Sequence, residues 1–311
     1  MKRVLVTGAS GFIGWQSLGA LVERGYEVIA VTSRPSPRTF PGVKWINADL
    51  MDPTATAALM AAHSPRFLLH FAWYAEPGKF WNSQENFRWV QASLTLLQNF
   101  ALYGGTRVVT AGTCAEYDWK AGYCVERQTA LEPSTIYGTC KHALQEMQSA
   151  FCRQAGIGEA WGRVFLTYGP REHPSRLVAS VITSLLKCEP ARCSHGGQTR
   201  DLMHVQDVAE AFAALLDSDF EGPVNIASGS PIALKDAIYS IADRLGRRKL
   251  VELGAVPSPP DEPPLLVADT RRLQREVGWT PRYDLASGLE QTVRWWQSHS
   301  GVAGREGAVV V

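Results

Sequence analysis

Short apolar runs alternate with longer amphipathic runs along the first half of the chain. The short runs are rich in valine, leucine and isoleucine, which is typical of strands buried on both faces. They lie at residues 2–7, 27–32, 43–46, 66–71, 106–110 and 159–166. The longer runs predict helices that end near residues 24, 62, 103 and 155. This regular alternation of strand and helix predicts an α/β fold with a doubly wound parallel sheet.

The pattern changes after Tyr168. Helices are predicted near residues 175–187, 206–217, 233–245 and 283–297, with short strands and a proline-rich loop at 257–264 between them. We therefore expect a larger domain over residues 1–168 and a smaller C-terminal α/β domain over residues 169–311. Segments near residues 200–228 are expected to return to the first domain.

The predicted helix at residues 85–103 is apolar on more than one face. Its large apolar side chains are Phe87, Trp89, Val90, Leu94, Leu96, Leu97 and Phe100. Such a helix can pack on a sheet and on a partner subunit at once, so we expect a homodimer.

Composition narrows the classes of partner. The 311 residues are 45% hydrophobic and 20% charged with a net charge of +1, which gives no sign of a nucleic-acid polymer or a membrane surface as partner. No apolar run reaches the length of a membrane-spanning helix or of a signal peptide. The six cysteines show no C-x-x-C spacing, and we expect reduced thiols in a cytoplasmic protein.

A glycine-rich loop joins the first predicted strand to the first helix. Gly8, Gly11 and Gly14 are spaced G-x-x-G-x-x-G, with Ser10, Phe12 and Ile13 between them. Glycines let a phosphate approach the backbone, and the amides at the helix N-terminus face it. The loop therefore predicts that residues 1–168 are a dinucleotide-binding, Rossmann-type domain.

The end of the second strand bears on which dinucleotide binds. An acid there usually holds the ribose 2′-hydroxyl of NAD, but this chain has Ser33-Arg34. A hydroxyl and a guanidinium suit a 2′-phosphate, so we expect NADP(H) to be preferred over NAD(H). An arginine in solvent is the alternative interpretation.

Other candidates follow the C-terminal ends of later strands, where doubly wound sheets bind ligands. They are Asp49 and Leu50 beside an adenine, Phe71, Ala72 and Trp73 after the fourth strand, and Thr113 after the fifth.

Tyr137 and Lys141 are four residues apart on a predicted helix and therefore share a face. A nearby ammonium favours the phenolate and lowers the pKa of a phenol from its usual ~10. A phenol tuned in this way can transfer a proton near neutral pH. Taken alone, the spacing also fits two unrelated surface residues.

With these motifs together, the chain resembles the extended short-chain dehydrogenase/reductase family, in its nucleotide-sugar epimerase/dehydratase/reductase branch. The resemblance extends to about residue 298. Its markers are Gly8/Gly11/Gly14, Asp49-Leu50, Thr113 four residues before Tyr117, Tyr137/Lys141, Tyr168-Gly169-Pro170-Arg171, Arg200-Asp201, His204-Val205, Asp207-Val208-Ala209 and Gly278-Trp279-Thr280-Pro281.

The resemblance implies a role for each site. Tyr137 exchanges a proton with the substrate, Lys141 holds the nicotinamide ribose and lowers the Tyr137 pKa, and Thr113 bonds the substrate oxygen. It also implies that residues 169–311 bind mainly a nucleotide-diphosphate sugar. Further contacts are implied for Phe165 with the nicotinamide, and with the substrate for Trp73, Cys114, Arg171, Arg176 and Arg200. Asp207 and Trp279 are implied to be structural.

The chain departs from the family pattern near the expected sugar pocket. Asparagines are common in the family where this chain has Trp89 and Leu166. Aromatic bulk is also unusual there, although core packing is an alternative for these rings: Trp73, Tyr74, Trp81 and Trp89.

A second departure concerns reaction class. Dehydratases of the family carry an acidic pair directly after the active-site Thr or Ser, where this chain has Cys114-Ala115. Glu116 follows, and on an extended segment it would point away from Thr113. This favours an NADPH-dependent reductase of a 4-keto-6-deoxy nucleotide sugar. A 4-epimerase with bound NAD and a non-catalytic dinucleotide-binding regulator are the alternatives. We expect no metal site, because His204 and Asp207 are interpreted as a capping pair.

Overall fold

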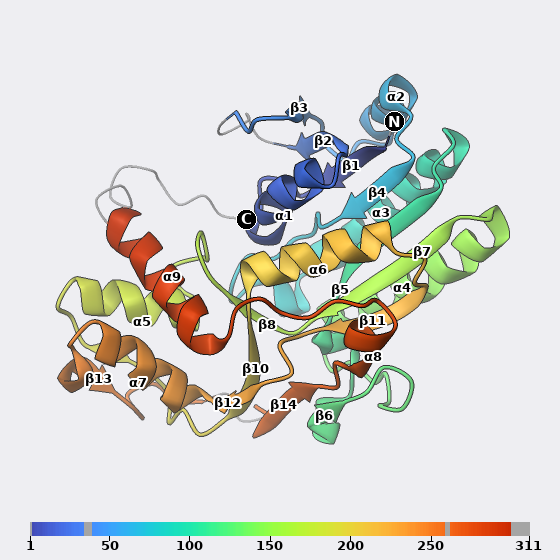
Figure 1. Cartoon of the computed structure of the whole chain (residues 1–311). Helices are drawn as coiled ribbons and strands as arrows, with labels where there is room; N and C mark the ends of the chain where they lie inside the picture. The colour runs from blue at the N-terminus through green and yellow to red at the C-terminus, as the bar shows by residue number, and fades with distance from the viewer. Residues whose placement is uncertain (1, 34–38, 259–261, 300–311) are drawn as a thin grey trace.

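A computed structural model describes residues 2–33, 39–258 and 262–299 (Figure 1). Its larger sheet has seven strands in the order β11-β7-β5-β4-β1-β2-β3, and every neighbouring pair is parallel. The strands are β1 (Arg3–Thr7), β2 (Glu27–Thr32), β3 (Val43–Asn47), β4 (Phe67–His70), β5 (Arg107–Thr113), β7 (Gly158–Val164) and β11 (Gly222–Ile226). The predicted doubly wound sheet is confirmed.

Helices cover both faces of this sheet, as Figure 1 shows. One face carries α1 (Phe12–Glu23) and α6 (Val205–Asp217), and the other carries α2 (Pro53–His63), α3 (Glu85–Leu102) and α4 (Ile136–Ala155). The inner strands β1, β2 and β4 are buried between the two layers, which explains why their sequences are almost continuously apolar, whereas β3 at the edge of the sheet is only partly buried. No helix in the described ranges is both long enough and apolar enough to cross a bilayer.

A smaller sheet is built mainly from the second half of the chain. Its order is β12-β10-β14-β6, and β8 also pairs with β10. The strands are β6 (Tyr123–Cys124), β8 (Leu166–Tyr168), β10 (Thr199–His204), β12 (Pro231–Ala233) and β14 (Leu265–Ala268), and a separate pair is β9 (Ala191–Arg192) with β13 (Val251–Glu252). A second apolar core includes residues of α5 (Leu177–Leu186), α7 (Leu234–Arg244) and α9 (Leu285–His299). Short helices are α8 (Arg271–Arg275), η1 (Phe80–Asn82), η2 (Cys114–Glu116), η3 (Trp119–Ala121) and η4 (Arg248–Leu250).

Each half of the chain contributes a strand to the sheet that is built mainly from the other half. β11 lies in the larger sheet beside β7, whereas β6, from the first half of the chain, pairs with β14 of the smaller sheet. The strand expected at residues 159–166 is two strands: β7 ends at Val164, the Phe165 amide donates to the Ile226 carbonyl, and β8 then pairs with β10. A domain boundary at residue 168 stays a prediction.

Candidate active site

Two glycines of the first loop are required by close backbone packing. Gly8 has a φ of +63°, and a Cβ on it would lie 2.7 Å from the Ala72 nitrogen. A Cβ on Gly14 would overlap the Gly8 carbonyl oxygen. α1 begins at Phe12, and its N-cap, Gly11, has no side chain to accept bonds from the first-turn amides. These amides are therefore available to an anion, which fits the phosphates of a dinucleotide.

The other expected contacts of the cofactor's adenosine half lie beyond β2 and β3. Ser33 is exposed after β2, and the hydroxyls of Ser10 and Thr32 are 3.3 Å apart. Arg34 lies outside the described residues. Asp49 accepts a hydrogen bond from the Met51 amide. Leu50 is buried in the apolar core on the side of the sheet that α2, α3 and α4 cover.

A buried histidine that sequence reasoning did not single out supports the segment after β4. The Ser93 hydroxyl donates its proton to the Trp89 carbonyl, so its oxygen can only accept from His70 Nε2. The neutral ring then carries no proton on Nδ1, which accepts from Thr7 Oγ1 at 2.6 Å. Thr7 Oγ1 in turn accepts from the Ala72 amide. Burial lowers the pKa of His70 to about 3, so the ring is neutral.

Phe71, Ala72 and Trp73 follow this hydrogen-bonded histidine. The side chains of Phe71 and Trp73 pack against different elements. The Phe71 ring packs edge-on against Phe212 of α6. The Trp73 indole is buried, donates to Asn86 Oδ1 at 2.8 Å and lies beneath Lys141.

Lys141 is buried on α4. Its ammonium donates to the Ala111 carbonyl oxygen at 2.9 Å and lies 3.7 Å from the centre of the Trp73 ring. Burial lowers the Lys141 pKa to about 7.

Tyr137 lies in the first turn of α4, whose N-cap Thr135 accepts from the Gly138 amide. A Cβ on Gly138 would overlap the Ala115 carbonyl oxygen, so this glycine lets α4 touch η2. The helix thereby brings the Tyr137 phenol to Thr113, and a hydrogen bond with Thr113 acts to lower the Tyr137 pKa.

Burial nevertheless raises the Tyr137 pKa above its ordinary value. The structure therefore differs from the expectation that Lys141 lowers it. Removal of the phenol from water is the stronger effect, and the ammonium is directed at Ala111 and Trp73 instead.

Aromatic rings surround the Tyr137 phenol. Phe80 and Trp81 of η1 meet it edge-on, with ring centres 4.8 and 5.8 Å away, and Trp73 lies at 6.5 Å. Trp89 stacks on Trp73, whereas Tyr74 bonds Glu76. The aromatic residues noted in the sequence thus split: Trp73 and Trp81 contact the catalytic candidate, and Phe80 joins them without having been singled out.

Thr113 ends β5 and caps η2. Its hydroxyl accepts from the Ala115 amide at 3.2 Å, and its own amide donates to Glu116 Oε1 at 2.8 Å. Residues 114–116 therefore turn rather than extend. The expectation that Glu116 points away from Thr113 was wrong, because it assumed an extended segment.

Two residues expected at the ligand are buried beside Thr113. Cys114 and Phe165 belong to one apolar cluster with Tyr117 and Leu266. Burial raises the Cys114 pKa to about 12, so its thiol stays protonated. Leu166, which replaces a common family asparagine, is half-buried at the edge of this cluster.

The three expected substrate arginines occupy different places. Arg200 is buried on β10 and forms an ion pair with Glu262 at 3.0 Å. Burial lowers the Arg200 pKa, and Glu262 and Cys114 act in the opposite direction. Arg176 is exposed at the start of α5, and its charge acts to lower the Tyr137 pKa. The Arg171 guanidinium instead lies over Trp15 of α1, with its carbon 4.2 Å from the ring centre.

His204 and Asp207 act at the start of α6. The His204 ring accepts from the Gln206 amide as N-cap, and Asp207 accepts from the Tyr283 amide at 2.8 Å. Within the described ranges, no group of three or more His, Cys, Asp or Glu side chains is placed to hold a metal ion.

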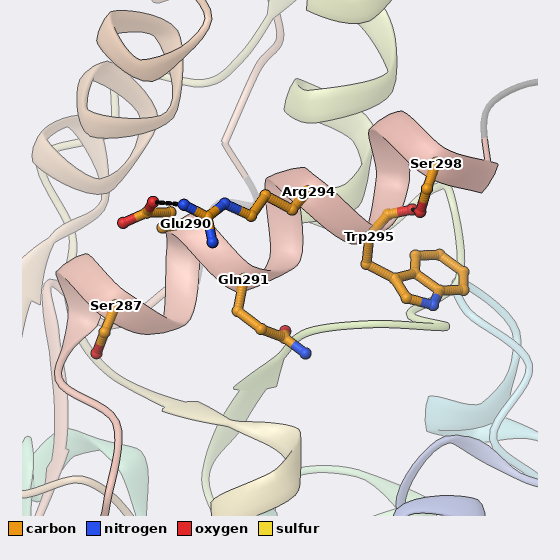
Figure 2. A pocket seen from close by; sticks show the side chains of 6 residues that line it. All are labelled: Ser287, Glu290, Gln291, Arg294, Trp295 and Ser298. Atoms are coloured by element: carbon orange, nitrogen blue, oxygen red, sulfur yellow. Dashed lines mark hydrogen bonds and ion pairs between the residues drawn. The ribbon is translucent and has the colours of Figure 1, made fainter.

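A shallow surface pocket lies elsewhere, along α9 (Figure 2). In it Glu290 pairs with Arg294, and Gln291 bonds His204. It contains no residue that the sequence singled out for chemistry. Its remaining lining residues are Ser287, Trp295 and Ser298.

Comparison with known proteins found a matching family and similar structures. The model of the NAD dependent epimerase/dehydratase family matches residues 4–227. The dTDP-glucose 4,6-dehydratase of Xanthomonas campestris pv. campestris is 26% identical over 333 residues, covering 95% of this chain and 93% of that protein.

Two solved structures are similar over nearly the whole chain. The UDP-glucose 4-epimerase of Thermus thermophilus, in complex with NAD, has a TM-score of 0.86 at 26% identity and covers 95% of this chain and 99% of its own. MoeE5, in complex with UDP-glucose and NAD, has a TM-score of 0.81 at 27% identity and covers 96% of this chain and 99% of its own.

Proposed function

Since this chain belongs to the NAD dependent epimerase/dehydratase family, we propose that it is an NADPH-dependent reductase of a 4-keto-6-deoxy nucleotide sugar. The family match confirms the resemblance inferred from the sequence. The observation that carries the narrower proposal is the segment after Thr113. It offers Cys114 and Ala115 where a dehydratase needs an acid and a base.

The side chains around Thr113 support a reaction with a single proton transfer. The raised pKa of Cys114 leaves a neutral thiol, and Ala115 has no proton to exchange. Glu116 is held in an ion pair with Arg163 at 2.6 Å. None of these three groups is suited to take a proton from a sugar carbon and help a hydroxide leave.

Tyr137 is the proposed proton donor. Its raised pKa keeps the phenol protonated at neutral pH, which suits a group that gives a proton to a carbonyl oxygen. Thr113 is the proposed second contact of that oxygen, and Lys141 the proposed contact of the nicotinamide ribose. When bound, the nicotinamide supplies the hydride.

We propose NADP(H) as the preferred cofactor. The described end of β2, Thr32-Ser33, carries no acid to hold a ribose 2′-hydroxyl, and Arg34 follows in the sequence. NAD(H) is the alternative, since both solved neighbours named above bind NAD.

A nucleotide-sugar 4-epimerase is the second candidate. The similarity to the Thermus thermophilus epimerase favours it. An epimerase would use Tyr137 in both directions and would keep its cofactor bound through the cycle.

We also propose a homodimer built on α3 and α4. Phe87 and Leu102 of α3 are 54% and 74% exposed, and Met147 of α4 is exposed as well. Burying such side chains against a second copy would remove apolar surface from water. A cytoplasmic location stays a prediction from the cysteine pattern.

The test combines purified protein with NADPH and a panel of nucleotide sugars. We expect one NADPH consumed for each 4-keto-6-deoxy sugar reduced, and no dehydration of an unmodified nucleotide hexose. Interconversion of two nucleotide hexoses without net NADPH consumption would show the epimerase instead. Tight cofactor binding without turnover of any sugar would favour a regulator.

A further inference from the structure

A fully buried ion pair between Glu116 and Arg163 lies next to the backbone of Thr113. Glu116 and Arg163 are both 0% exposed, and Arg163 Nε donates to Glu116 Oε2 at 2.6 Å. Trp161 Nε1 donates to the other carboxylate oxygen at 2.9 Å. Burying two charges is costly, and replacement of such a pair by apolar side chains is often neutral or stabilising. Stability alone therefore gives little reason for this pair.

The Glu116 carboxylate also accepts a hydrogen bond from the backbone of Thr113. The Thr113 amide donates to Glu116 Oε1 at 2.8 Å, and the Thr113 hydroxyl accepts from the Ala115 amide. With the hydroxyl oxygen engaged in this way, its own proton is available to the phenol oxygen of Tyr137 or to a substrate oxygen. Glu116 thus holds the backbone from which the Thr113 hydroxyl projects.

Gly112 makes the arrangement possible. A Cβ on Gly112 would overlap Trp161 Nε1 and would lie 2.6 Å from Glu116 Oε1. Only glycine therefore lets β5 approach the carboxylate closely enough for the Thr113 amide to reach it.

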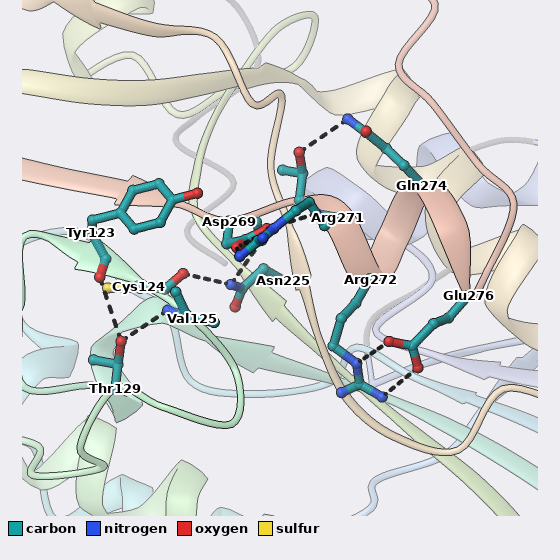
Figure 3. Close-up of polar contacts among 11 residues, drawn as sticks. Tyr123, Cys124, Val125, Thr129, Asn225, Asp269, Arg271, Arg272, Gln274 and Glu276 are labelled. Atoms are coloured by element: carbon teal, nitrogen blue, oxygen red, sulfur yellow. Dashed lines mark hydrogen bonds and ion pairs between the residues drawn. The ribbon is translucent and has the colours of Figure 1, made fainter.

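Arg163, the other member of the ion pair, is connected to the smaller sheet by a chain of hydrogen bonds. Arg163 Nη1 donates to the Tyr117 hydroxyl, which donates to Asn225 Oδ1 at 2.7 Å. The side-chain amide nitrogen of Asn225, Nδ2, then donates to the carbonyls of Cys124 and Asp269, as Figure 3 shows. Cys124 belongs to β6 and Asp269 follows β14.

This path connects the two halves of the proposed site. β14 is the neighbour of β10, on which Arg200 lies opposite Leu266. Thr113 and Arg200 are therefore linked through buried hydrogen bonds and one strand pair.

We propose that Glu116 is a positioning residue that, by accepting a hydrogen bond from the Thr113 amide, fixes the Thr113 hydroxyl for proton transfer. This rests on the proposed function, in which Thr113 contacts the substrate oxygen. Misplacing such a group by about 1 Å can cost about a hundredfold in rate.

Two double variants separate positioning from packing. Glu116→Gln with Arg163→Met removes both charges but leaves an amide oxygen that can accept from Thr113. Glu116→Leu with Arg163→Met removes the charges and the acceptor together. The first should keep kcat within about threefold of the wild type, and the second should lose about tenfold to a hundredfold in kcat at nearly unchanged KM. Equal kcat in the two would overturn the proposal.

A matched control is Asp207→Asn, which alters another buried carboxylate that accepts a backbone amide, far along the chain from Thr113. It should lower Tm while leaving kcat unchanged. A kcat loss equal to that of the leucine double variant would also count against positioning by Glu116.

Hydrogen exchange of the Thr113 amide gives a readout that needs no substrate. Exchange should be slow in the wild type and the glutamine double variant, and faster in the leucine double variant. Wild-type protein that reduces no sugar would refute the proposed function, whereas equal exchange in both double variants would refute the positioning role. If a double variant does not fold, Glu116→Asp, which shortens the carboxylate, should show faster exchange than the wild type, and unchanged exchange would overturn the proposal.

Discussion

The ammonium of Lys141 lies 3.7 Å from the centre of the Trp73 ring and donates to the carbonyl oxygen of Ala111. Burial lowers its pKa from 10.5 to about 7, although the charge of Glu116 acts in the opposite direction. The contact with the ring offsets part of the cost of burying the charge. Lys141 should therefore be a titrating group near neutral pH.

This has a consequence for stability. Between pH 7 and 10.5 the unfolded chain binds the Lys141 proton while the folded chain releases it, so the free energy of unfolding rises with pH over this window. Lys141→Met should remove this contribution. Denaturant unfolding of both proteins at several pH values should give a wild-type minus variant difference that increases with pH, and a constant difference would contradict the lowered pKa.

Replacement of the proposed proton donor should separate binding from chemistry. Tyr137→Phe keeps the ring that packs against Phe80 and Trp81, so it should fold and bind NADPH like the wild type. Turnover should fall by about two to four orders of magnitude, the range for a general acid–base residue. Cofactor fluorescence and steady-state rates measure the two properties. Full activity in this variant would refute the role of Tyr137.

Close packing of the glycine loop predicts contrasting effects of two alanine substitutions in α1. Gly14→Ala would place a methyl group against the Gly8 carbonyl, so it should lower Tm and weaken cofactor binding. Gly19→Ala would bring its methyl only 3.6 Å from the Phe40 ring, an ordinary contact. It should raise stability by roughly 0.5–1 kcal/mol, because alanine favours the helix. Equal effects in thermal unfolding and cofactor titration would argue against the tight turn.

Cofactor preference should depend on the residues after β2. Arg34→Ala should weaken NADPH binding by about tenfold to a hundredfold, the worth of one charge-assisted contact, and leave NADH binding unchanged. Ser33→Asp should shift preference toward NADH, because a carboxylate repels a 2′-phosphate and accepts from a 2′-hydroxyl. Equal affinity of the wild-type protein for both cofactors, measured by titration, would remove the basis of this prediction.

The two arginines that precede α5 should differ in their effect on substrate binding. The Arg176 charge acts on Tyr137, whereas the Arg171 guanidinium lies over Trp15. Arg176→Ala should raise the KM for the nucleotide sugar about tenfold, the loss of one charge-assisted contact, and Arg171→Ala should leave it nearly unchanged. Steady-state kinetics on the same substrate compares them, and a larger effect of Arg171→Ala would reverse the assignment.

Local sequence determined much of this protein. Period and burial pattern are properties of neighbouring residues, so strands such as Glu27–Thr32 and the helix that carries Tyr137 and Lys141 could be predicted without a structure. The glycine spacing at Gly8 and Gly14 likewise indicated a close backbone approach, because no other residue type fits it.

Tertiary structure decided which distant segments meet. β6 pairs with β14 and β11 with β7 across long stretches of intervening chain, and no local pattern encodes such partners. The Glu116–Arg163 pair behind Thr113 depends on the turn of η2 and on the approach of β7, so an assumption of extended backbone placed Glu116 wrongly. The protonation states of Tyr137 and Lys141 depend on how deeply each is buried, because desolvation outweighs the effect of their four-residue spacing.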